Sequence, residues 1–246
     1  MTLRDSARRV GLARALSKLG YCSRSRAFEL IEAGRAGVNG RICRDPEAPV
    51  RLGRDRLEVD GRPLDRAAKI YLMLNKPRGI VTTASDEKNR QTVYDCLDPS
   101  LPWVGPVGRL DKASEGLLLL TNDSEWSARI LAPETHLEKT YHVQIARIAD
   151  DGLVAVITQG VRTREGDRLG AKAARILRVG DKNSWLEIVL DEGKNRHIRR
   201  MLEALDIEVL RLVRVAIGPL VLGELAKGSS RSLSRAEKLA LDRAVS

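Results

Sequence analysis

The chain has 246 residues, of which 43% are hydrophobic and only 3% aromatic, and 43 lysines and arginines stand against 33 aspartates and glutamates. The apolar content excludes a wholly disordered chain, and the length suits one large domain or a small domain joined to a medium one. The formal net charge of +10 favours a polyanionic partner, because each phosphate that a cation neutralises releases counterions.

The cysteines and the apolar runs exclude further classes of protein. Cys22, Cys43 and Cys96 are odd in number and lack CxxC spacing, which argues against a disulfide framework and against a zinc site. No apolar run approaches the length of a membrane span, and the N-terminus lacks the apolar stretch of a signal peptide. We therefore expect a cytoplasmic protein with no membrane partner and no metal.

Two helices are the first elements that the sequence predicts. Residues 12–19 carry apolar side chains at the spacing of one helix face. Ser23 is a suitable N-cap for a second helix over residues 24–33, and Gly34 follows at the position that favours a left-handed residue. The two predicted helices are short and close together, as in a small domain.

Two hairpin turns are predicted after these helices. Asn39-Gly40 and Asp60-Gly61 are the dipeptides that fit positive φ in a tight hairpin, and apolar residues flank them. Residues 11–66 therefore predict a small helix-rich domain that ends in short strands.

This first domain is rich in arginine, including Arg24 and Arg26 on the second predicted helix. The segment RALSKLGYCSRSRAFELIEAGRAGVNGR, residues 14–41, resembles the S4-type RNA-binding domain. The resemblance implies that Arg24 and Arg26 lie on a face that contacts folded RNA. A solvated helix face is the alternative explanation for the same arginines.

The pattern changes after a polar link at residues 65–68. The predicted elements of the second domain are strands at residues 70–74, 79–83, 140–145, 185–190 and 208–215, a surface loop at 84–100, and helices at 195–205 and 233–245. Strands with interspersed helices predict an α+β domain with a mainly antiparallel sheet over residues 69–232. A helical tail is expected at 233–246.

Asp111 is the first candidate for catalysis. It follows glycines at 105 and 108 and precedes a buried apolar strand, so its carboxylate is expected at the rim of a core. A partly desolvated carboxylate in such a place can act as a nucleophile or a base. The motif GRLD alone does not distinguish this role from that of an ordinary turn aspartate.

Four motifs in a fixed order carry a stronger signal. They are LNKPRG at 74–79, GRLDKASEGLLLLTND at 108–123, EKTYHV at 138–143 and EGKNRHIRRM at 192–201. In this order they resemble the RsuA/RluB/RluE/RluF family of bacterial ribosomal-RNA pseudouridine synthases. The resemblance implies an isomerase that converts uridine to pseudouridine in ribosomal RNA or an assembling ribosomal subunit, as a monomer and without any cofactor.

The resemblance assigns three catalytic residues. Asp111 would be the nucleophile, attacking the ribose C1′ or the base C6, which the sequence does not distinguish. Tyr141 would stack on the flipped uracil and act in the removal of the C5 proton. Arg199 would pair with Asp111, since an adjacent guanidinium favours an ionised carboxylate.

Further residues are assigned to the substrate and to RNA in the same way. Lys76 and Pro77 would pack beneath the tyrosine, Arg109 would fill the gap that the flipped nucleotide leaves, and Leu212 would form an apolar floor under the uracil. These predicted contacts to RNA also include Arg196, Arg200, Arg24 and Arg26. The sequence departs from the family pattern at Ser114, Ser124 and His197, none of which removes a catalytic group.

Two other functions compete with this hypothesis. A non-catalytic RNA-binding or ribosome-assembly protein would explain the charge but not the catalytic trio. A glycosidase would need a second carboxylate about 5–9.5 Å from the first, and Glu115 is expected to be a turn residue instead. The spacing of EGKNR favours 23S over 16S ribosomal RNA as the substrate.

Overall fold

The computed structural model describes residues 9–83 and 90–246. Its contacts divide the chain into two compact units. Unit 1 comprises the chain up to residue 71 with segments 98–105 and 120–126, and unit 2 comprises segments 72–97, 106–119 and 127–246. The domain boundaries predicted at residues 66–69 and 232–233 rest on sequence pattern and stay a prediction.

Unit 1 contains two helices near its beginning, α1 (Leu12–Lys18) and α2 (Arg24–Glu32), which contact each other. The Ser23 hydroxyl accepts a hydrogen bond from the Arg26 backbone N–H at 3.1 Å, so it caps α2 as predicted. Gly34 has φ +74° just beyond the end of α2, which confirms the predicted left-handed stop.

Short strands complete the first part of unit 1. They are β1 (Val10–Gly11), β2 (Ala36–Val38), β3 (Arg41–Ile42), β4 (Pro49–Val50), β5 (Leu57–Val59) and β6 (Arg62–Pro63). The order β3-β2-β5-β6 forms one antiparallel sheet, and β1 pairs with β4. Both predicted turns have positive φ at their two central residues, at Asn39-Gly40 and Asp60-Gly61, as tight hairpins require.

The chain continues with a larger sheet, whose order in the described residues is β13-β14-β10-β15-β9-β7-β17. The strands of this part are β7 (Tyr71–Lys76), β8 (Gly105–Val107), β9 (Glu115–Thr121), β10 (Lys139–Ile145), β11 (Val161–Arg162), β12 (Arg168–Leu169), β13 (Ala173–Val179), β14 (Ser184–Leu190), β15 (Val209–Ile217), β16 (Leu220–Val221) and β17 (Ser230–Ser232). Strands β13, β14, β10 and β15 pair antiparallel, whereas β15 and β9 pair parallel. The predicted α+β class with a mainly antiparallel sheet is confirmed.

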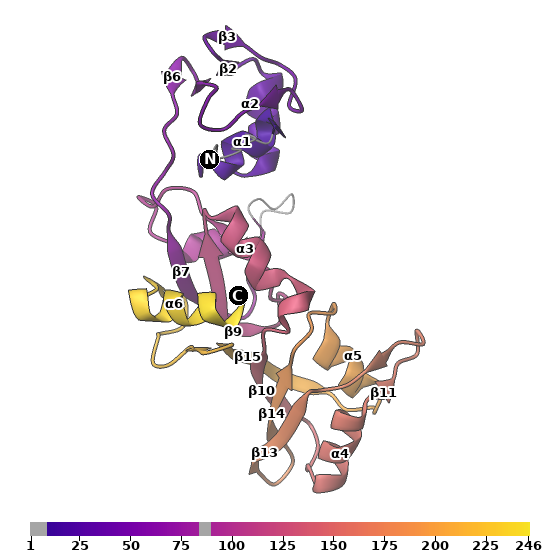
Figure 1. The fold of residues 1–246 in the computed structure, drawn as a ribbon. Helices are drawn as coiled ribbons and strands as arrows, with labels where there is room; N and C mark the ends of the chain where they lie inside the picture. The colour runs from indigo at the N-terminus through magenta and orange to yellow at the C-terminus, as the bar shows by residue number, and fades with distance from the viewer. Residues whose placement is uncertain (1–8, 84–89) are drawn as a thin grey trace, which may run out of the picture. The chain divides into compact units, whose positions relative to one another are not determined.

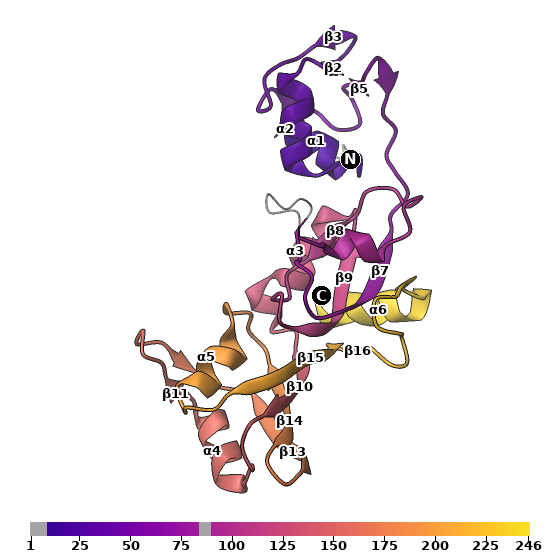
Figure 2. The ribbon, with the colours of Figure 1, turned by 180° about the vertical axis from the view of Figure 1, so that it is seen from behind.

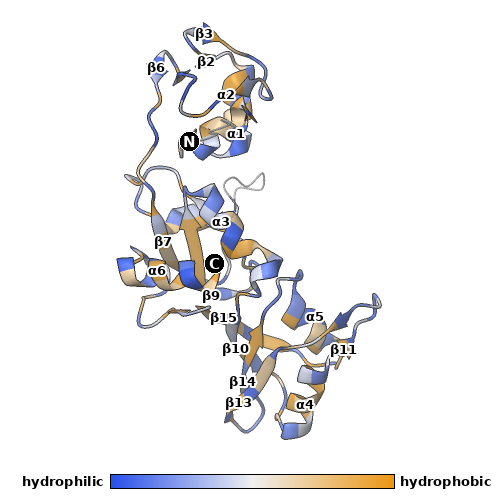
Figure 3. Cartoon of the chain, in the orientation of Figure 1, coloured by the Kyte–Doolittle hydropathy of each residue, from blue (hydrophilic) through white to orange (hydrophobic). Residues whose placement is uncertain are grey.

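The helices of this part are α3 (Ser124–Leu131), α4 (Asp151–Gln159), α5 (His197–Glu203) and α6 (Arg235–Ala244), with 3-10 turns at Val93–Cys96 and Pro133–Thr135. Both views show α4 and α5 beside strands β10, β13 and β14 (Figures 1 and 2). Apolar side chains of α4 and α5 share one core with those of β10, β14 and β15. The apolar colouring of β9 marks a strand that is buried along its whole length (Figure 3).

Some sequence predictions of this part were wrong. Residues 79–83 form no strand but a turn with a single bridge from Val81 to Thr92. The predicted loop at 84–100 contains a 3-10 helix at Val93–Cys96, and its residues 84–89 lie outside the described part. Among the described residues, no helix has the length and apolar character needed to cross a membrane.

Candidate active site

A cavity of about 560 Å³ in unit 2 brings together Asp111, Tyr141 and Leu212, which come from three separate motifs. Asp111 lies in the loop between β8 and β9, Tyr141 on β10 and Leu212 on β15. No described residue donates a hydrogen bond to the Asp111 carboxylate, and about a third of that side chain is exposed. Its oxygen lone pairs are therefore free to react with a ligand in the cavity.

The backbone around Asp111 is fastened by Lys76, which is fully buried at the end of β7. The Lys76 ammonium donates to the carbonyls of Pro77 at 3.1 Å, Asp111 at 3.1 Å and Ser114 at 2.9 Å. Burial lowers the pKa of Lys76 to about 8, although the nearby negative charges of Asp111 and Glu115 oppose that shift. The fully buried ammonium thus supports the loop that carries Asp111, and the predicted place of Lys76 beneath the tyrosine stays a prediction.

The arginines near Asp111 are arranged differently from the prediction. The Nη1 atom of Arg196 lies 3.9 Å from the Oδ2 atom of Asp111, whereas Arg199 makes no ion pair with this carboxylate. Arg199 instead donates to the Ala113 carbonyl at 3.0 Å, within the same loop. Burial and the repulsion of Arg196 lower the pKa of Arg199, and the attraction of Asp111 offsets part of this effect.

The start of α5 explains this exchange of roles. The helix begins at His197, two residues later than predicted, and Arg196 at its N-cap has φ +48°. This left-handed conformation is uncommon for a residue with a side chain, and such residues concentrate at functional sites. Arg196 therefore reaches Asp111 from outside the helix, while Arg199 contacts the loop from within it.

Tyr141 and Leu212 lie on one face of the sheet. Tyr141 pairs with Arg214 and Val143 pairs with Leu212 in the antiparallel register of β10 and β15. Alternation along a strand places residues two apart on the same face, so Lys139 and Tyr141 share a face of β10, as do Leu212 and Arg214 on β15. All four side chains line the cavity.

The close approach of β9 to β15 depends on Gly116. This residue has φ +102°, and a Cβ atom there would lie 2.2 Å from the Arg214 carbonyl oxygen. Only glycine fits this position without separating the two strands. Gly116 therefore lets the beginning of β9, which follows the loop that carries Asp111, lie directly beside Arg214 of β15.

The other predicted contacts to RNA have different surroundings. Arg109 is exposed and lines the cavity, as a residue that reaches RNA must, and Pro77 is half-buried. Arg200 instead binds the carboxylates of Glu165 and Asp167, between β11 and β12. Two carboxylates thus hold the Arg200 guanidinium in this structure, and its predicted contact with phosphates stays a prediction.

The arginines of α2 remain accessible. Arg24 and Arg26 are both exposed, and Arg26 makes an ion pair with Glu29 at 2.6 Å. This pair is a surface contact between exposed side chains, so it contributes little and leaves Arg26 able to exchange partners.

Several residues of the cavity were missed by the sequence interpretation. They are Ser114, Lys139, Asp191, Glu192 and Arg214. The period of two along the strands was the available signal for Lys139 and Arg214. His197, noted only as a departure from the family pattern, is buried in the same wall, and burial lowers its pKa while Glu192 opposes the shift.

Glu115 is not the turn residue that was predicted. It is the first residue of β9, is 3% exposed, and makes ion pairs with Lys227 at 2.5 Å and Arg211 at 3.2 Å. Burial would raise the pKa of Glu115, but the hydrogen bonds from Lys227 and Arg211 outweigh burial and lower it. Because its carboxylate is held by these bases and does not line the cavity, it is no second acid for Asp111.

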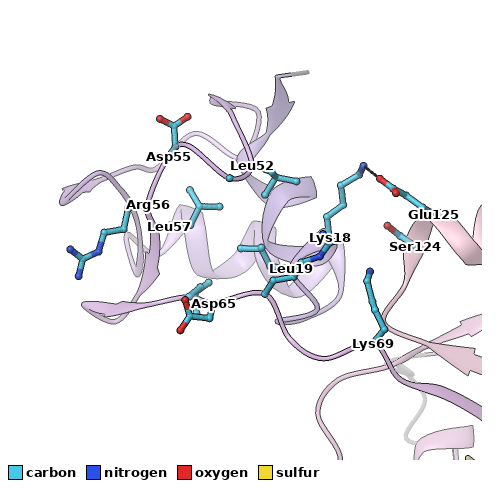
Figure 4. Close-up of a pocket in the computed structure, with 13 residues that line it drawn as sticks. Lys18, Leu19, Leu52, Asp55, Arg56, Leu57, Asp65, Lys69, Ser124 and Glu125 are labelled. Carbon is cyan, nitrogen blue, oxygen red and sulfur yellow. Dashed lines mark hydrogen bonds and ion pairs between the residues drawn. The ribbon is translucent and has the colours of Figure 1, made fainter. Parts of the chain in front are cut away.

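A second cavity, of about 490 Å³, belongs to unit 1 (Figure 4). Lys18 makes an ion pair with Glu125 at 2.8 Å beside it. Its lining contains charges of both signs but none of the predicted catalytic residues. Within residues 9–83 and 90–246, no group of three or more histidine, cysteine, aspartate or glutamate side chains is arranged to hold a metal ion.

Comparison with known proteins places both regions in families. Residues 70–204 match the family described as RNA pseudouridylate synthase, and residues 10–55 match the S4 domain. A ribosomal large subunit pseudouridine synthase B of Bacillus subtilis is 36% identical over 91% of each chain. An uncharacterized RNA pseudouridine synthase of Aquifex aeolicus is 38% identical over 96% of this chain and 95% of its own.

A solved structure agrees with the sequence comparisons. The crystal structure of a pseudouridylate synthase aligns with 94% of this chain and 99% of its own, with a TM-score of 0.67 and 30% identity. The non-catalytic and glycosidase hypotheses are therefore displaced. The chain belongs to the RNA pseudouridylate synthase family, whose members are isomerases, and it carries an S4 domain at its N-terminus.

Proposed function

We propose that this protein converts a uridine of large-subunit ribosomal RNA to pseudouridine, with Asp111 as the nucleophile. The observation that carries the proposal is the Asp111 carboxylate, which accepts no hydrogen bond from a described residue, in a cavity that also holds Tyr141 and Leu212. A flipped uracil needs an aromatic face, an apolar support and one reactive group, and these three side chains supply them.

The chemistry requires one carboxylate and no external reagent. If Asp111 attacks C1′, an ester bond forms there and uracil leaves with the electron pair of the C1′–N1 bond. The uracil then turns, C5 attacks C1′, and the carboxylate leaves with its electron pair. The C5 proton is lost and N1 gains one, so the product is an isomer of the substrate. Tyr141 is positioned in the same cavity to stack on the ring and to take part in the proton transfer.

Attack at C6 is the alternative route for the same residue. It forms a bond from the Asp111 oxygen to C6 and moves the electron pair of the C5–C6 double bond toward O4. Both routes need a carboxylate oxygen that is free of hydrogen bonds, and both use the same cavity. The proposal therefore rests on Asp111 and not on the choice between C1′ and C6.

Tritium release from ribosomal RNA that carries 5-tritiated uridine tests the role of Asp111. We expect Asp111→Asn to lose at least about 10⁴-fold in rate, a loss typical of removing the central group of a catalytic unit. Asp191→Asn is the matched control, because it removes a carboxylate from the same cavity. It should stay within about tenfold of the wild type. Retention of turnover by Asp111→Asn would refute the assignment.

The choice of ribosomal RNA follows from the relatives. The Bacillus relative is named for the ribosomal large subunit, so we extend that substrate class to this chain and place the target in 23S rather than 16S RNA. Primer extension after carbodiimide treatment, on RNA from cells with and without the gene, maps the modified position. A gene-dependent stop only in 16S RNA would overturn the choice of 23S.

We further propose that residues 11–66 bind ribosomal RNA through α2. Arg24 and Arg26 are exposed there, and a phosphate neutralised by arginine adds about 0.7–0.9 to the slope of log affinity against log salt concentration. We expect Arg24→Ala to weaken binding and to lower that slope by about this amount. Arg243→Ala, an exposed change on α6, is the control. Equal slopes in the two variants would argue against RNA binding by α2.

The remaining expectations are part of the same proposal. The protein would act as a monomer in the cytoplasm, on free RNA or on an assembling subunit. Sedimentation at the concentrations used for the activity assay tests the first point. A stable dimer at those concentrations would contradict the expectation of a monomer.

A further inference from the structure

Arg214 is a buried arginine whose hydrogen bonds are incomplete. It lies on β15, is 6% exposed, and lines the cavity that holds Asp111. Its Nε atom donates to the Leu117 carbonyl at 2.7 Å, whereas its buried Nη2 atom has no hydrogen-bond partner among the described residues. Leaving a buried charged donor without an acceptor costs more free energy than leaving a neutral donor unpaired. This geometry therefore indicates a ligand that presents acceptor oxygens to Arg214.

A second cation lies in the same wall. Lys139 lines the cavity from β10, on the face that it shares with Tyr141. Burial lowers the pKa of Lys139, and the repulsion of Arg214 adds to that effect. Neither cation makes an ion pair with a carboxylate in the described part of the chain, so this wall of the cavity favours a ligand that carries or develops negative charge.

We propose that Arg214 binds the carbonyl oxygens of the flipped uracil and stabilises the negative charge that they develop, with Lys139 as an auxiliary cation. This inference rests on the function proposed above, because it names the part of the uridine that Arg214 recognises. Tyr141 stands directly opposite Arg214 in the β10–β15 register, so a ring stacked on Tyr141 has its edge within reach of the guanidinium.

The charge that Arg214 would stabilise arises by either route of the reaction. Attack of Asp111 at C1′ releases uracil with the electron pair of the glycosidic bond, and the negative charge spreads over N1, O2 and O4. Attack at C6 instead places the charge of an enolate on O4. A fixed guanidinium aimed at these oxygens acts in the transition state of both routes, as preorganised donors do for other oxyanions.

The base is a better partner for Arg214 than a phosphate. A phosphate remains attached to the RNA backbone at the entrance of the site, where Arg109 and Arg196 are exposed and line the cavity. Arg214 is among the buried residues of the sheet, and only the base of a flipped nucleotide enters so deeply. The exposed arginines therefore suit the phosphates, and Arg214 suits the uracil edge.

Single-turnover tritium release at saturating enzyme tests this inference. We expect Arg214→Met to slow the reaction about 10²–10³-fold, the effect of losing one oxyanion donor. The dissociation constant for RNA should change less than about threefold, since the contact strengthens in the transition state. Arg214→Lys should recover part of the rate, because it keeps the charge but loses the planar fork.

Arg211→Met is the matched control. Arg211 also lies on β15 and also binds β9, through Glu115, but it does not line the cavity. A merely structural role of Arg214 predicts equal losses of rate in the two variants, and that result would overturn the inference. If Arg214→Met is unfolded at the assay temperature, Arg214→Lys decides: a rate equal to that of the wild type refutes a role of the guanidinium fork.

Three further outcomes separate the competing explanations. If Arg214→Met weakens RNA binding, lowers the salt slope by about 0.7–0.9 and leaves the single-turnover rate unchanged, its partner is a phosphate and the inference fails. If the wild-type protein itself forms no pseudouridine in any ribosomal RNA, the proposed function fails, and this inference fails with it. Wild-type turnover with an unaffected Arg214→Met refutes this inference alone.

Discussion

Replacing Lys76 with methionine tests how the loop that carries Asp111 is held. Methionine has a similar length and keeps the site apolar, but it removes the ammonium that binds the carbonyls of Pro77, Asp111 and Ser114. The carbonyls of Asp111 and Ser114 belong to the loop between β8 and β9, and Ser114 directly precedes β9, whereas Pro77 follows β7. The variant therefore leaves the Asp111 side chain intact while it removes the support of its backbone.

The magnitude follows from two opposing contributions. Three acceptors lose their donor, at about 2 kcal/mol each, or about 6 kcal/mol together. Methionine also avoids the free-energy cost of burying a charge. The pKa of Lys76 falls from 10.5 to about 8 on folding, and this shift corresponds to a cost of ~3 kcal/mol. The net expectation is a loss of about 3 kcal/mol in the free energy of unfolding.

Urea unfolding and single-turnover tritium release measure the two consequences of Lys76→Met. We expect a rate loss on the order of 100-fold, because a nucleophile displaced by about 1 Å loses about this much. Lys112→Met is the control, since Lys112 is an exposed lysine of the same loop. A Lys76→Met protein as stable and active as the Lys112→Met protein would refute the role of the three carbonyl bonds.

The same lysine predicts a pH dependence whose sign differs for stability and activity. Between about pH 8 and 10.5 the unfolded chain holds the Lys76 proton and the folded chain does not, so this group makes folding more favourable as the pH rises. A neutral amine has only two N–H donors for three carbonyls, so the loop loosens and the rate should fall above about pH 8. A rate that stays level to pH 9.5 would contradict this account.

Three more substitutions test the supporting structure. Gly116→Ala places a Cβ atom 2.2 Å from the Arg214 carbonyl oxygen at φ +102°, so we expect a loss of at least about 3 kcal/mol by urea unfolding and a loss of tritium release. Glu115→Gln should cost about 2 kcal/mol at pH 7, and the difference should vanish in acid, because the wild type loses its advantage as the pH falls through the lowered pKa of Glu115. Ser23→Ala removes the N-cap of α2 and should cost about 1 kcal/mol by the same measurement, without changing turnover on saturating RNA.

The local elements were predictable because their signals are local. The cap at Ser23 and the stop at Gly34 each act within a few residues of α2, and the structure has both. The face of β10 was predictable in the same way, since a period of two places Tyr141 toward one side. The α+β class followed from the succession of such elements.

The supports of the site were not predictable, because they join distant parts of the chain. Lys76 binds backbone carbonyls 35 and 38 residues away, and any residue type offers a carbonyl, so no sequence pattern marks the acceptor. The position of Arg196 depends on a backbone dihedral rather than on helix periodicity. The sequence predicted a helix from residue 195, which would point Arg196 away from Asp111. In the structure Arg196 precedes the helix with φ +48°, and its Nη1 atom lies 3.9 Å from the Oδ2 atom of Asp111.

The cations of the site differ in burial, and that difference separates their roles. Lys76 is 0% exposed and donates its hydrogen bonds to backbone carbonyls. Arg214 is 6% exposed, donates one hydrogen bond to a backbone carbonyl, and has a buried Nη2 atom without a partner among the described residues. Arg196, with half of its side chain exposed, lies 3.9 Å from Asp111, which is attraction at long range without a hydrogen bond. A direct bond would occupy the oxygen that must attack. The spacing thus lets a cavity with more basic than acidic side chains attract RNA, while the proposed nucleophile accepts no hydrogen bond.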